Sequence, residues 1–149
     1  MLETRINIKL LMGKNVYIPH AATEGSAGAD LRASIDEPIV LPPNSWEFIS
    51  AGFAIEIPPG LFGLVAPRSG LATKGIVLKN VLGVIDSDYR GELKVALCNT
   101  TESSFTVNPL DRIAQLLILP CISNVRYTMV QELSQTTRGT GGFGSTGIA

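Results

Sequence analysis

The sequence predicts an all-β domain, a sandwich or a barrel, on three observations. Apolar and polar residues alternate along several short segments, which is typical of half-buried strands. The 15 glycines and 9 prolines of the 149 residues are spread along the chain and divide it into such segments. No segment has the pattern of an amphipathic helix of ten residues or more. Many short strands between turn signals favour an all-β sandwich or barrel.

The expected elements follow in order along the chain. Alternation predicts strands at residues 5–10, 55–57, 92–98 and 105–107. The segments 76–81 and 113–119 are more continuously apolar, which indicates strands buried on both faces. One short helix is expected at 69–74, with Ser69 as its N-cap and Gly75 as the residue that ends it.

Length and composition exclude several classes of protein. A chain of 149 residues forms one domain and buries about two-thirds of its surface on folding. A hydrophobic content of 45% excludes global disorder, and a net charge of −1 argues against a general nucleic-acid binder. No apolar segment approaches a membrane span, and the first residues lead into no signal-peptide core. We therefore expect a soluble, cytoplasmic protein with no nucleic-acid or membrane partner.

Cysteine and histidine offer little chemistry. Cys98 and Cys121 lack metal-ligand spacing and are too few for a disulfide scaffold, so both are interpreted as small apolar fillers. The only histidine, His20, is interpreted as a solvated loop residue. Neither zinc binding nor a Ser–His pair is therefore expected.

The C-terminal segment differs from the rest, because residues 138–147 hold five glycines. Such a segment cannot bury enough surface to order itself, so we expect a β domain at 1–137 and a mobile tail at 138–149. The tail is either a frayed terminus or a strap that closes over a nucleotide. As a strap, the tail would bind phosphate through Arg138, contact a base through Phe143 and donate a hydrogen bond from the Ser145 hydroxyl.

Four further segments hold candidate site residues. Arg68 beside a helix capped by Ser69 is either a small anion site or an ordinary turn with a surface arginine. Asp86 is either an Asx-turn residue or a group that orients water or holds a metal. Gln115, polar within an apolar strand, is either hydrogen-bonded in the core or faces a ligand. Asp30 could simply form an ion pair with Arg32.

Taken in order, five segments resemble the five motifs of the homotrimeric deoxyuridine triphosphate nucleotidohydrolase (dUTPase) family. They are residues 27–33, 67–75, 83–91, 111–116 and 138–147. The resemblance implies a jelly-roll β fold, the dUTPase-like β-clip, in a trimer with three active sites, each built from all three chains. One departure is Leu110, where a glycine is expected before Asp111, so the turn is expected to differ there.

The resemblance also implies the reaction, in which dUTP and water give dUMP and pyrophosphate. This activity limits uracil incorporation into DNA and supplies dUMP for dTMP synthesis. Asp86 would hold the attacking water. Mg²⁺ would bind the triphosphate with no direct protein ligand, and Asp30 and Gln115 would be outer-shell groups.

The substrate-binding residues implied by the resemblance fall into three groups. The phosphate group is Arg68, Ser69, Gly70 and Gln115, with Arg138, Gly144 and Ser145 closing over the far phosphates. The uracil group is Asn80 with the backbone near Val84, Ile85 and Lys94, and Phe143 stacked above. Tyr89 would lie under the deoxyribose and exclude a 2′-hydroxyl.

Three other functions compete with dUTP hydrolysis as interpretations of the sequence. A dCTP deaminase shares the fold, but it has a glutamate where this chain aligns Ala96, and an Arg-Ser-Ser signature where Gly70 stands here. A catalytically silent jelly-roll binding module is disfavoured because Asp86, Tyr89 and Phe143 are all retained. A pyrophosphatase of another Mg²⁺-dependent family would normally supply clustered acidic ligands on helices.

Overall fold

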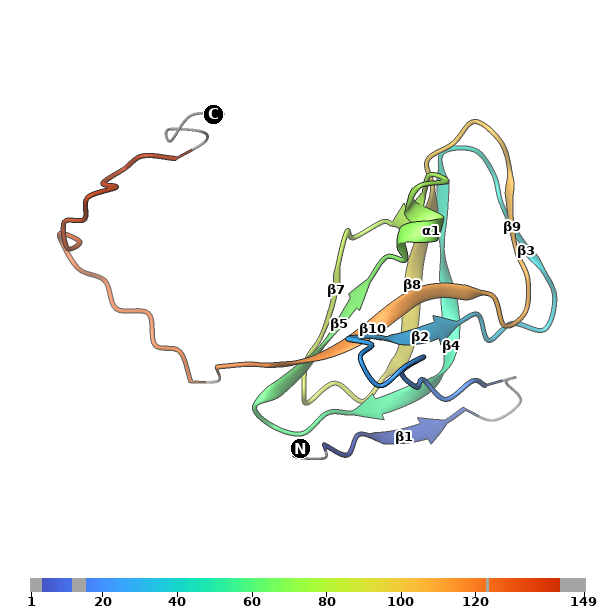
Figure 1. Ribbon diagram of the computed structural model, residues 1–149, viewed down its shortest axis with the longest axis horizontal. Helices are drawn as coiled ribbons and strands as arrows, with labels where there is room; N and C mark the ends of the chain where they lie inside the picture. The colour runs from blue at the N-terminus through green and yellow to red at the C-terminus, as the bar shows by residue number, and fades with distance from the viewer. Residues whose placement is uncertain (1–3, 12–15, 123, 143–149) are drawn as a thin grey trace.

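The computed structural model describes residues 4–11, 16–122 and 124–142, and in these ranges the chain is almost entirely β-structure (Figure 1). The elements are β1 (Asn7–Leu10), β2 (Ala29–Arg32), β3 (Ile39–Leu41), β4 (Ser45–Glu56), β5 (Leu61–Ala66), α1 (Ser69–Ala72), β6 (Ile76–Leu78), β7 (Gly83–Ile85), β8 (Glu92–Asn99), β9 (Phe105–Val107) and β10 (Arg112–Pro120). The all-β prediction with one short helix is confirmed. No described helix is both long and apolar enough to cross a membrane.

The strands form three antiparallel sheets. Their orders are β1-β4-β8-β6, β2-β10-β5-β7 and β3-β9. The core lies between the two larger sheets, and its largest fully buried side chain is Phe53 of β4. In β8, Leu93, Val95 and Leu97 are buried and Lys94 is exposed, as the alternation predicted, but Ala96 is buried as well.

Two strand predictions were wrong in part. β6 ends at Leu78, because the chain turns toward β7: the amide of Val81 donates to the carbonyl of Leu78 at 3.1 Å, and Val81 has a φ of 62°. Val81 is consequently 73% exposed rather than buried. In β10, Ile113, Ala114 and Leu116 are buried, but residues 117–119 are only half-buried.

The short helix also begins differently from the prediction. Its N-cap is Arg68, which keeps extended backbone angles and makes no side-chain capping bond, so Ser69 is the first helical residue. The carbonyl of Arg68 instead accepts the amides of Leu71 and Ala72 at 3.0 and 2.9 Å. Gly75 does end this segment: its φ is 76°, and a Cβ there would lie 2.5 Å from Thr101.

Leu110 adopts the left-handed backbone that glycine adopts without strain, with a φ of 65°. Its amide donates to Ala33 at 2.8 Å, and its carbonyl accepts Arg32 Nη1 at 3.0 Å. The turn before β10 is therefore held by hydrogen bonds to β2 and the residue after it, despite the side chain at residue 110.

The two cysteines do not fill the core as expected. Cys98 is half-buried on β8, and Cys121 is exposed after the last strand. His20 is exposed as predicted, and its ring lies beside that of Tyr17, with centroids 5.1 Å apart.

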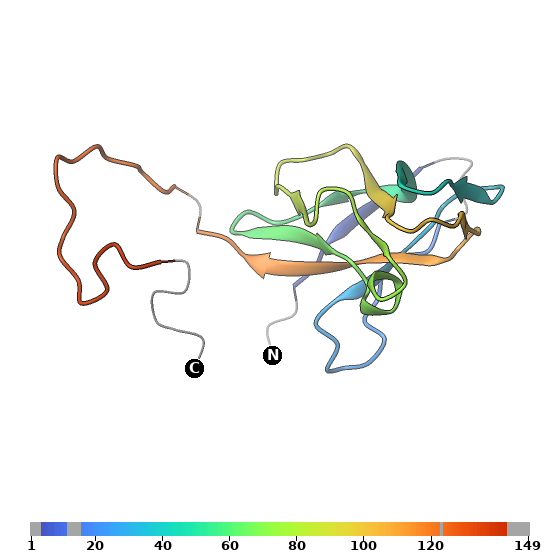
Figure 2. The ribbon, with the colours of Figure 1, turned by 90° about the horizontal axis from the view of Figure 1, so that it is seen from above.

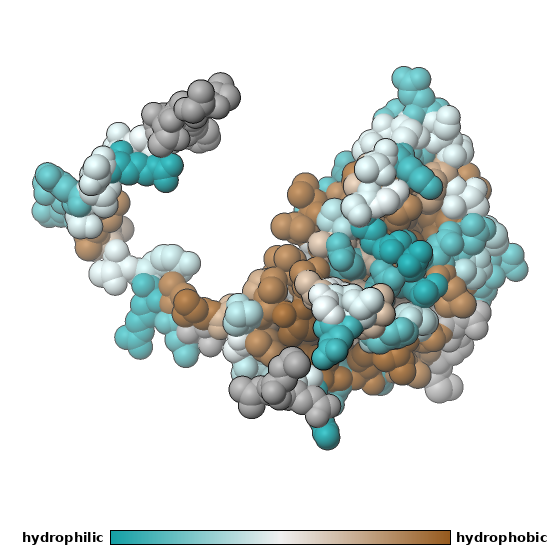
Figure 3. All heavy atoms as spheres, viewed as in Figure 1, coloured by the Kyte–Doolittle hydropathy of each residue, from teal (hydrophilic) through white to brown (hydrophobic). Residues whose placement is uncertain are grey.

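Beyond β10 the chain leaves the sheets. Residues 124–142 contain no helix or strand, and they extend away from the body in both views of the ribbon (Figures 1 and 2). Large apolar side chains on this segment are exposed; Tyr127 is 95% and Met129 99% exposed. The side of the body that faces this segment also carries hydrophobic surface (Figure 3). The boundary at residue 137 stays a prediction.

Candidate active site

One hollow, which we call the arginine pocket, lies where β2, β10 and the start of α1 meet. It has a volume of about 600 Å³ and is lined by Ala22, Ser26, Ala27, Gly28, Asp30, Arg68, Ser69, Gly70, Arg112 and Gln115. Strand register brings these residues together, because Gln115 of β10 pairs with Asp30 of β2 on one side and Ala66 of β5 on the other. The predicted phosphate residues of the body, Arg68, Ser69, Gly70 and Gln115, thus share one hollow with Asp30.

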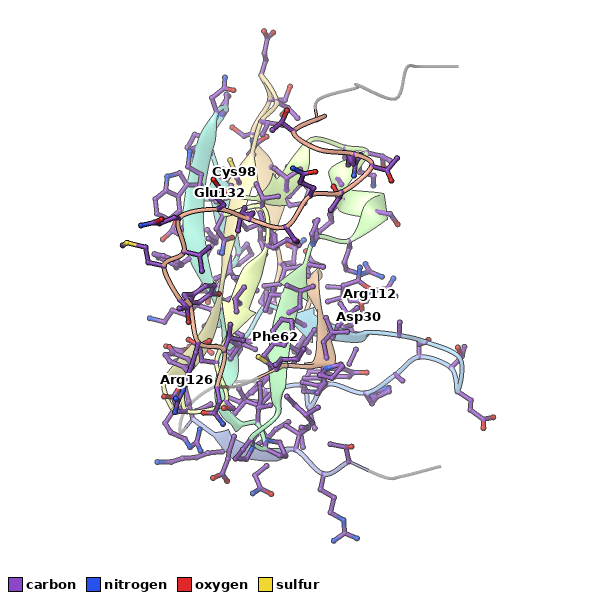
Figure 4. The ribbon with its side chains drawn as sticks, turned by 90° about the vertical axis from the view of Figure 1, so that its left-hand side faces the viewer. Asp30, Phe62, Cys98, Arg112, Arg126 and Glu132 are labelled. Carbon is purple, nitrogen blue, oxygen red and sulfur yellow. The ribbon has the colours of Figure 1, made fainter. Side chains whose placement is uncertain are left out.

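The charges of this pocket are arranged around Asp30. Arg68 Nε lies 2.9 Å from Asp30 Oδ1, and Arg112 Nη1 lies 3.7 Å from Asp30 Oδ2. Figure 4 shows Asp30 and Arg112 side by side at this edge. The alternative of an Asp30–Arg32 ion pair was wrong, since Arg32 lies over the Tyr17 ring at 4.3 Å instead. Two guanidinium groups facing one carboxylate leave an excess positive charge, which favours an anionic ligand.

Gln115 is hydrogen-bonded, and it also lines the arginine pocket. Its Nε2 donates to the carbonyl of Pro67 at 3.0 Å, which fixes the amide plane. Its Oε1 then faces Gly28, where an added Cβ would lie 3.1 Å away. The oxygen is therefore held at the pocket wall. Arg112 was given no role from the sequence, although an arginine directly after Asp111 in the same motif was a usable signal.

A second hollow, the hairpin pocket, lies beside the turn between β7 and β8. Its volume is about 460 Å³, and its lining is Phe48, Val84, Ile85, Asp86, Tyr89, Glu92, Leu93 and Lys94. The amide of Tyr89 donates to the carbonyl of Asp86 at 3.2 Å, which closes the turn. Phe48 comes from β4, and no motif predicted its presence here.

The ring of Tyr89 is fixed by its neighbours. Its hydroxyl donates to the carbonyl of Glu92 at 3.0 Å. The ring packs directly over Gly91, where a Cβ would lie 2.3 Å from the hydroxyl oxygen. Only glycine leaves this space, so the Tyr89–Gly91 pair sets the position of the aromatic surface.

A smaller hollow of about 120 Å³ adjoins the hairpin pocket, and Asn80 belongs to it. Val84, Ile85 and Lys94 line both hollows, and Ala96 contributes to the smaller one. The predicted uracil group of the body, Asn80 with Val84, Ile85 and Lys94, is therefore brought together around this slot. Ala96, which aligns with the glutamate of a dCTP deaminase, offers only a methyl group to this hollow. Glu92, the acidic side chain nearest along β8, is bonded to Ser50 and lies 3.2 Å from Lys94 Nζ.

The two pockets do not share a single lining residue. Within one chain, Asp86 and Tyr89 thus lie in a different hollow from Arg68 and Gln115. Arg138 lines neither pocket and belongs to the segment 124–142, which extends away from the sheets, and Phe143, Gly144 and Ser145 lie outside the described residues. The structure therefore places the predicted site residues of the body in two groups, which lie in separate pockets of one chain.

The all-β fold thus presents an arginine pocket on one sheet and an acid-bearing turn beside a slot that holds one side-chain amide, that of Asn80. The sequence model of the dUTPase family matches residues 14–147. The chain belongs to the dUTPase family, as the five motifs indicated.

Relatives and solved structures agree with this membership. Deoxyuridine 5'-triphosphate nucleotidohydrolase of Burkholderia mallei (strain SAVP1) is 45% identical over 146 residues, covering 96% of this chain and 98% of the relative. The protein of the same name from Thiobacillus denitrificans is 51% identical over 132 residues, covering 87% and 90%. The dUTPase of Staphylococcus bacteriophage 80alpha with dUPNHPP superposes with a TM-score of 0.88 at 29% identity, covering 98% and 100%.

A variant dUTPase of phage phi11 of S. aureus, described with a structural Mg(II) ion, superposes with a TM-score of 0.76 at 26% identity. The match covers 87% of this chain and 98% of that one. The predicted jelly-roll, β-clip fold is confirmed by these likenesses.

Proposed function

We propose that this chain is a dUTP diphosphatase, which hydrolyses dUTP to dUMP and pyrophosphate. In the cell this reaction limits uracil incorporation into DNA and supplies dUMP for dTMP synthesis. The observation that carries the proposal is that a chain of this family has both an arginine pocket and a hairpin pocket, the second with a slot that holds Asn80. A cytoplasmic location follows from the substrate, which is an intracellular nucleotide.

The arginine pocket takes the phosphates. Arg68 offers a charged donor at its wall, and Ser69 and Gly70 offer their backbone and hydroxyl groups beside it. Arg112 adds a second guanidinium, which the sequence had not assigned. Because charge stabilisation carries most of the burden in phosphoryl-type transfer, this pocket supplies the larger share of catalysis.

The hairpin pocket supplies the reacting acid and the sugar contact. The Asp86 carboxylate accepts a hydrogen bond from the attacking water and orients it toward the α-phosphorus. Tyr89, fixed over Gly91, lies under the deoxyribose and leaves no space for a 2′-hydroxyl. A 2′-hydroxyl there would meet the ring.

The slot beside Asn80 reads the base. The Asn80 side chain and the backbone at Val84, Ile85 and Lys94 match the donor and acceptor edge of uracil. Cytosine presents a donor where uracil presents an acceptor and leaves groups of the slot unpaired. Sites that read hydrogen bonds in this way reject such analogues by about 10⁴-fold or more.

The residues of the arginine pocket fit a Mg²⁺ ion carried by the substrate. Asp30 is already paired with two arginines, and Gln115 turns one oxygen to the pocket wall, so both suit contact through metal-bound water. Among the described residues, no three acidic, cysteine or histidine side chains cluster as a metal cage. Bound on the triphosphate, Mg²⁺ would neutralise charge on the phosphate oxygens.

A homotrimer joins the two halves of the site. The arginine pocket of one chain faces the hairpin pocket of a second, and the tail of a third closes over both with Arg138, Phe143, Gly144 and Ser145. Two observations support this arrangement: the pockets lie apart within one chain, and residues 124–142 extend away from it with apolar side chains exposed. The tail then acts on a neighbouring chain.

The test is pyrophosphate release with Mg²⁺ from dUTP, dTTP, dCTP and UTP, beside an Asp86→Asn control. The proposal expects release from dUTP alone, and its loss in the control. Ammonia from dCTP without pyrophosphate from dUTP would place the chain with the deaminases. No reaction with any nucleotide would point to a binding module, and dUTP affinity would then be measured.

A further inference from the structure

The turn that carries Asp86 and Tyr89 is fastened from its outer side by Arg90. Arg90 Nη1 donates to the carbonyl of Ser87 at 2.7 Å and to that of Tyr89 at 2.9 Å. Both acceptors lie within the four-residue turn. The guanidinium therefore bridges the backbone on which the two predicted site side chains stand.

The same guanidinium connects the turn to β4, the strand that pairs with β8. Arg90 Nη2 lies 3.1 Å from Glu56 Oε1, at the end of β4. Glu56 Oε2 accepts the Nδ2 of Asn7 at 2.8 Å, and Asn7 is the register partner of Glu56 on β1. The hydrogen bond from Asn7 and the charge of Arg90 hold the pKa of Glu56 below its ordinary value, so the acceptor stays charged. A continuous set of contacts thus runs from the turn to the edge of the β1–β4 pair.

We propose that Arg90 is a positioning residue for the hydrolysis, which fixes the Asp86–Tyr89 turn against β4 and β1 through Glu56 and Asn7. The inference rests on the proposed function and deepens it. Arg90 does not line the hairpin pocket, so it acts through the turn rather than on the substrate.

The exposure of the Arg90 and Glu56 side chains distinguishes a positioning role from a role in folding stability. The Arg90 and Glu56 side chains are 53% and 50% exposed, and exposed ion pairs contribute little to folding stability. The two bonds to backbone carbonyls, in contrast, restrain the turn directly. Since a misplacement of about 1 Å at a reacting group can cost about 100-fold in rate, loss of the bridge should reduce turnover far more than stability.

Lysine cannot replace the arginine. The guanidinium makes its three contacts through a rigid planar fork, whereas an ammonium is a single point on a flexible stem. Arg90→Lys should therefore keep the charge and lose most of the positioning.

The experiment compares Arg90→Gln, Arg90→Lys and Glu56→Gln with Arg5→Gln as the matched control. Arg5 lines the same outer hollow as Arg90, and it makes no hydrogen bond or ion pair with any described residue. Each variant is assayed for kcat and KM with dUTP, for the UTP to dUTP ratio, for its unfolding midpoint and for amide exchange of residues 83–92.

Wild-type hydrolysis of dUTP is measured first, and its absence would end the proposed function itself. Given that activity, we expect Arg90→Gln and Arg90→Lys to lower kcat by about 10- to 100-fold, with faster exchange in the turn and little change in the unfolding midpoint. Glu56→Gln should give a smaller loss, and Arg5→Gln none. Unchanged kcat in Arg90→Gln, or a loss no larger than in Arg5→Gln, would overturn the inference while leaving the proposed function standing. A kcat loss that follows a lowered midpoint, with no local change in exchange, would also overturn it.

Discussion

Replacing Asn99 by alanine should strongly destabilise the fold. Asn99 is completely buried at the end of β8. Its Nδ2 has two hydrogens for three carbonyl oxygens, those of Leu41, Pro42 and Ser103 at 3.0, 3.1 and 2.8 Å, so one hydrogen is shared between two acceptors. Its Oδ1 accepts the amide and hydroxyl of Thr101 at 3.0 and 2.8 Å. One amide group therefore joins three stretches of loop and strand.

The size of the effect follows from the partners left behind. Each buried polar group that loses its partner costs about 1–3 kcal/mol. The carbonyls of Ser103 and Pro42 each keep a second donor, the Thr101 hydroxyl at 2.9 Å and the Ser45 hydroxyl at 2.8 Å, so their loss is partly compensated. Counting mainly the carbonyl of Leu41 and the amide of Thr101, we expect a loss of about 2–4 kcal/mol. This is a large fraction of the roughly 5–15 kcal/mol typical of a whole domain.

The assay is urea unfolding followed by circular dichroism, at one protein concentration for all variants because association also affects apparent stability. Asn108→Ala is the matched control. Asn108 is exposed, and its side chain makes one long bond of 3.3 Å to Asp111, so it should change the unfolding free energy by no more than about 1 kcal/mol. If Asn99→Ala were as mild as this control, the reasoning from buried hydrogen bonds would be refuted.

Three further predictions concern the sugar contact, the tail and the charge of Glu56. Tyr89→Ala should raise activity on UTP relative to dUTP by about 10- to 100-fold, since overpacking costs about 1–3 kcal/mol; an unchanged ratio would remove the sugar role. Truncation after Gln135 should leave a folded trimer by light scattering with greatly reduced hydrolysis, and loss of the trimer would contradict the strap. Wild type should lose stability as the pH falls below the ordinary glutamate pKa of 4.5, because Glu56 has a lower pKa folded than unfolded. Glu56→Gln should show less of this loss in acid unfolding, and equal slopes would disprove it.

The sequence predicted best what depends on local patterns. The burial of Leu93, Val95 and Leu97 follows from alternation alone, which needs no knowledge of partners. The end of β6 could not be predicted in the same way. Val81 is apolar and β-branched, yet the turn into β7 places it in a left-handed conformation that its side chain disfavours.

The same distinction between local patterns and contacts made by the fold applies to the site. The motifs predicted which residues gather, but not the ion pairs of Asp30. Arg32 is two residues away in sequence, whereas Arg68 and Arg112 approach only because β10 lies between β2 and β5. The contacts of Arg90 could not be predicted for a different reason. Two of its hydrogen bonds go to backbone carbonyls, which leave no signature in side-chain patterns.

The separation of the two pockets has a consequence for inheritance. In the proposed trimer, a chain damaged at Asp86 still lends an intact arginine pocket to a neighbour, and a chain damaged at Arg68 still lends an intact hairpin pocket. In a cell that makes both damaged chains in equal amounts, each mixed trimer would combine two sound halves at one of its three sites, which is about a quarter of all sites. Two alleles that are each inactive alone would thus complement one another, as they could not if one chain held the whole site.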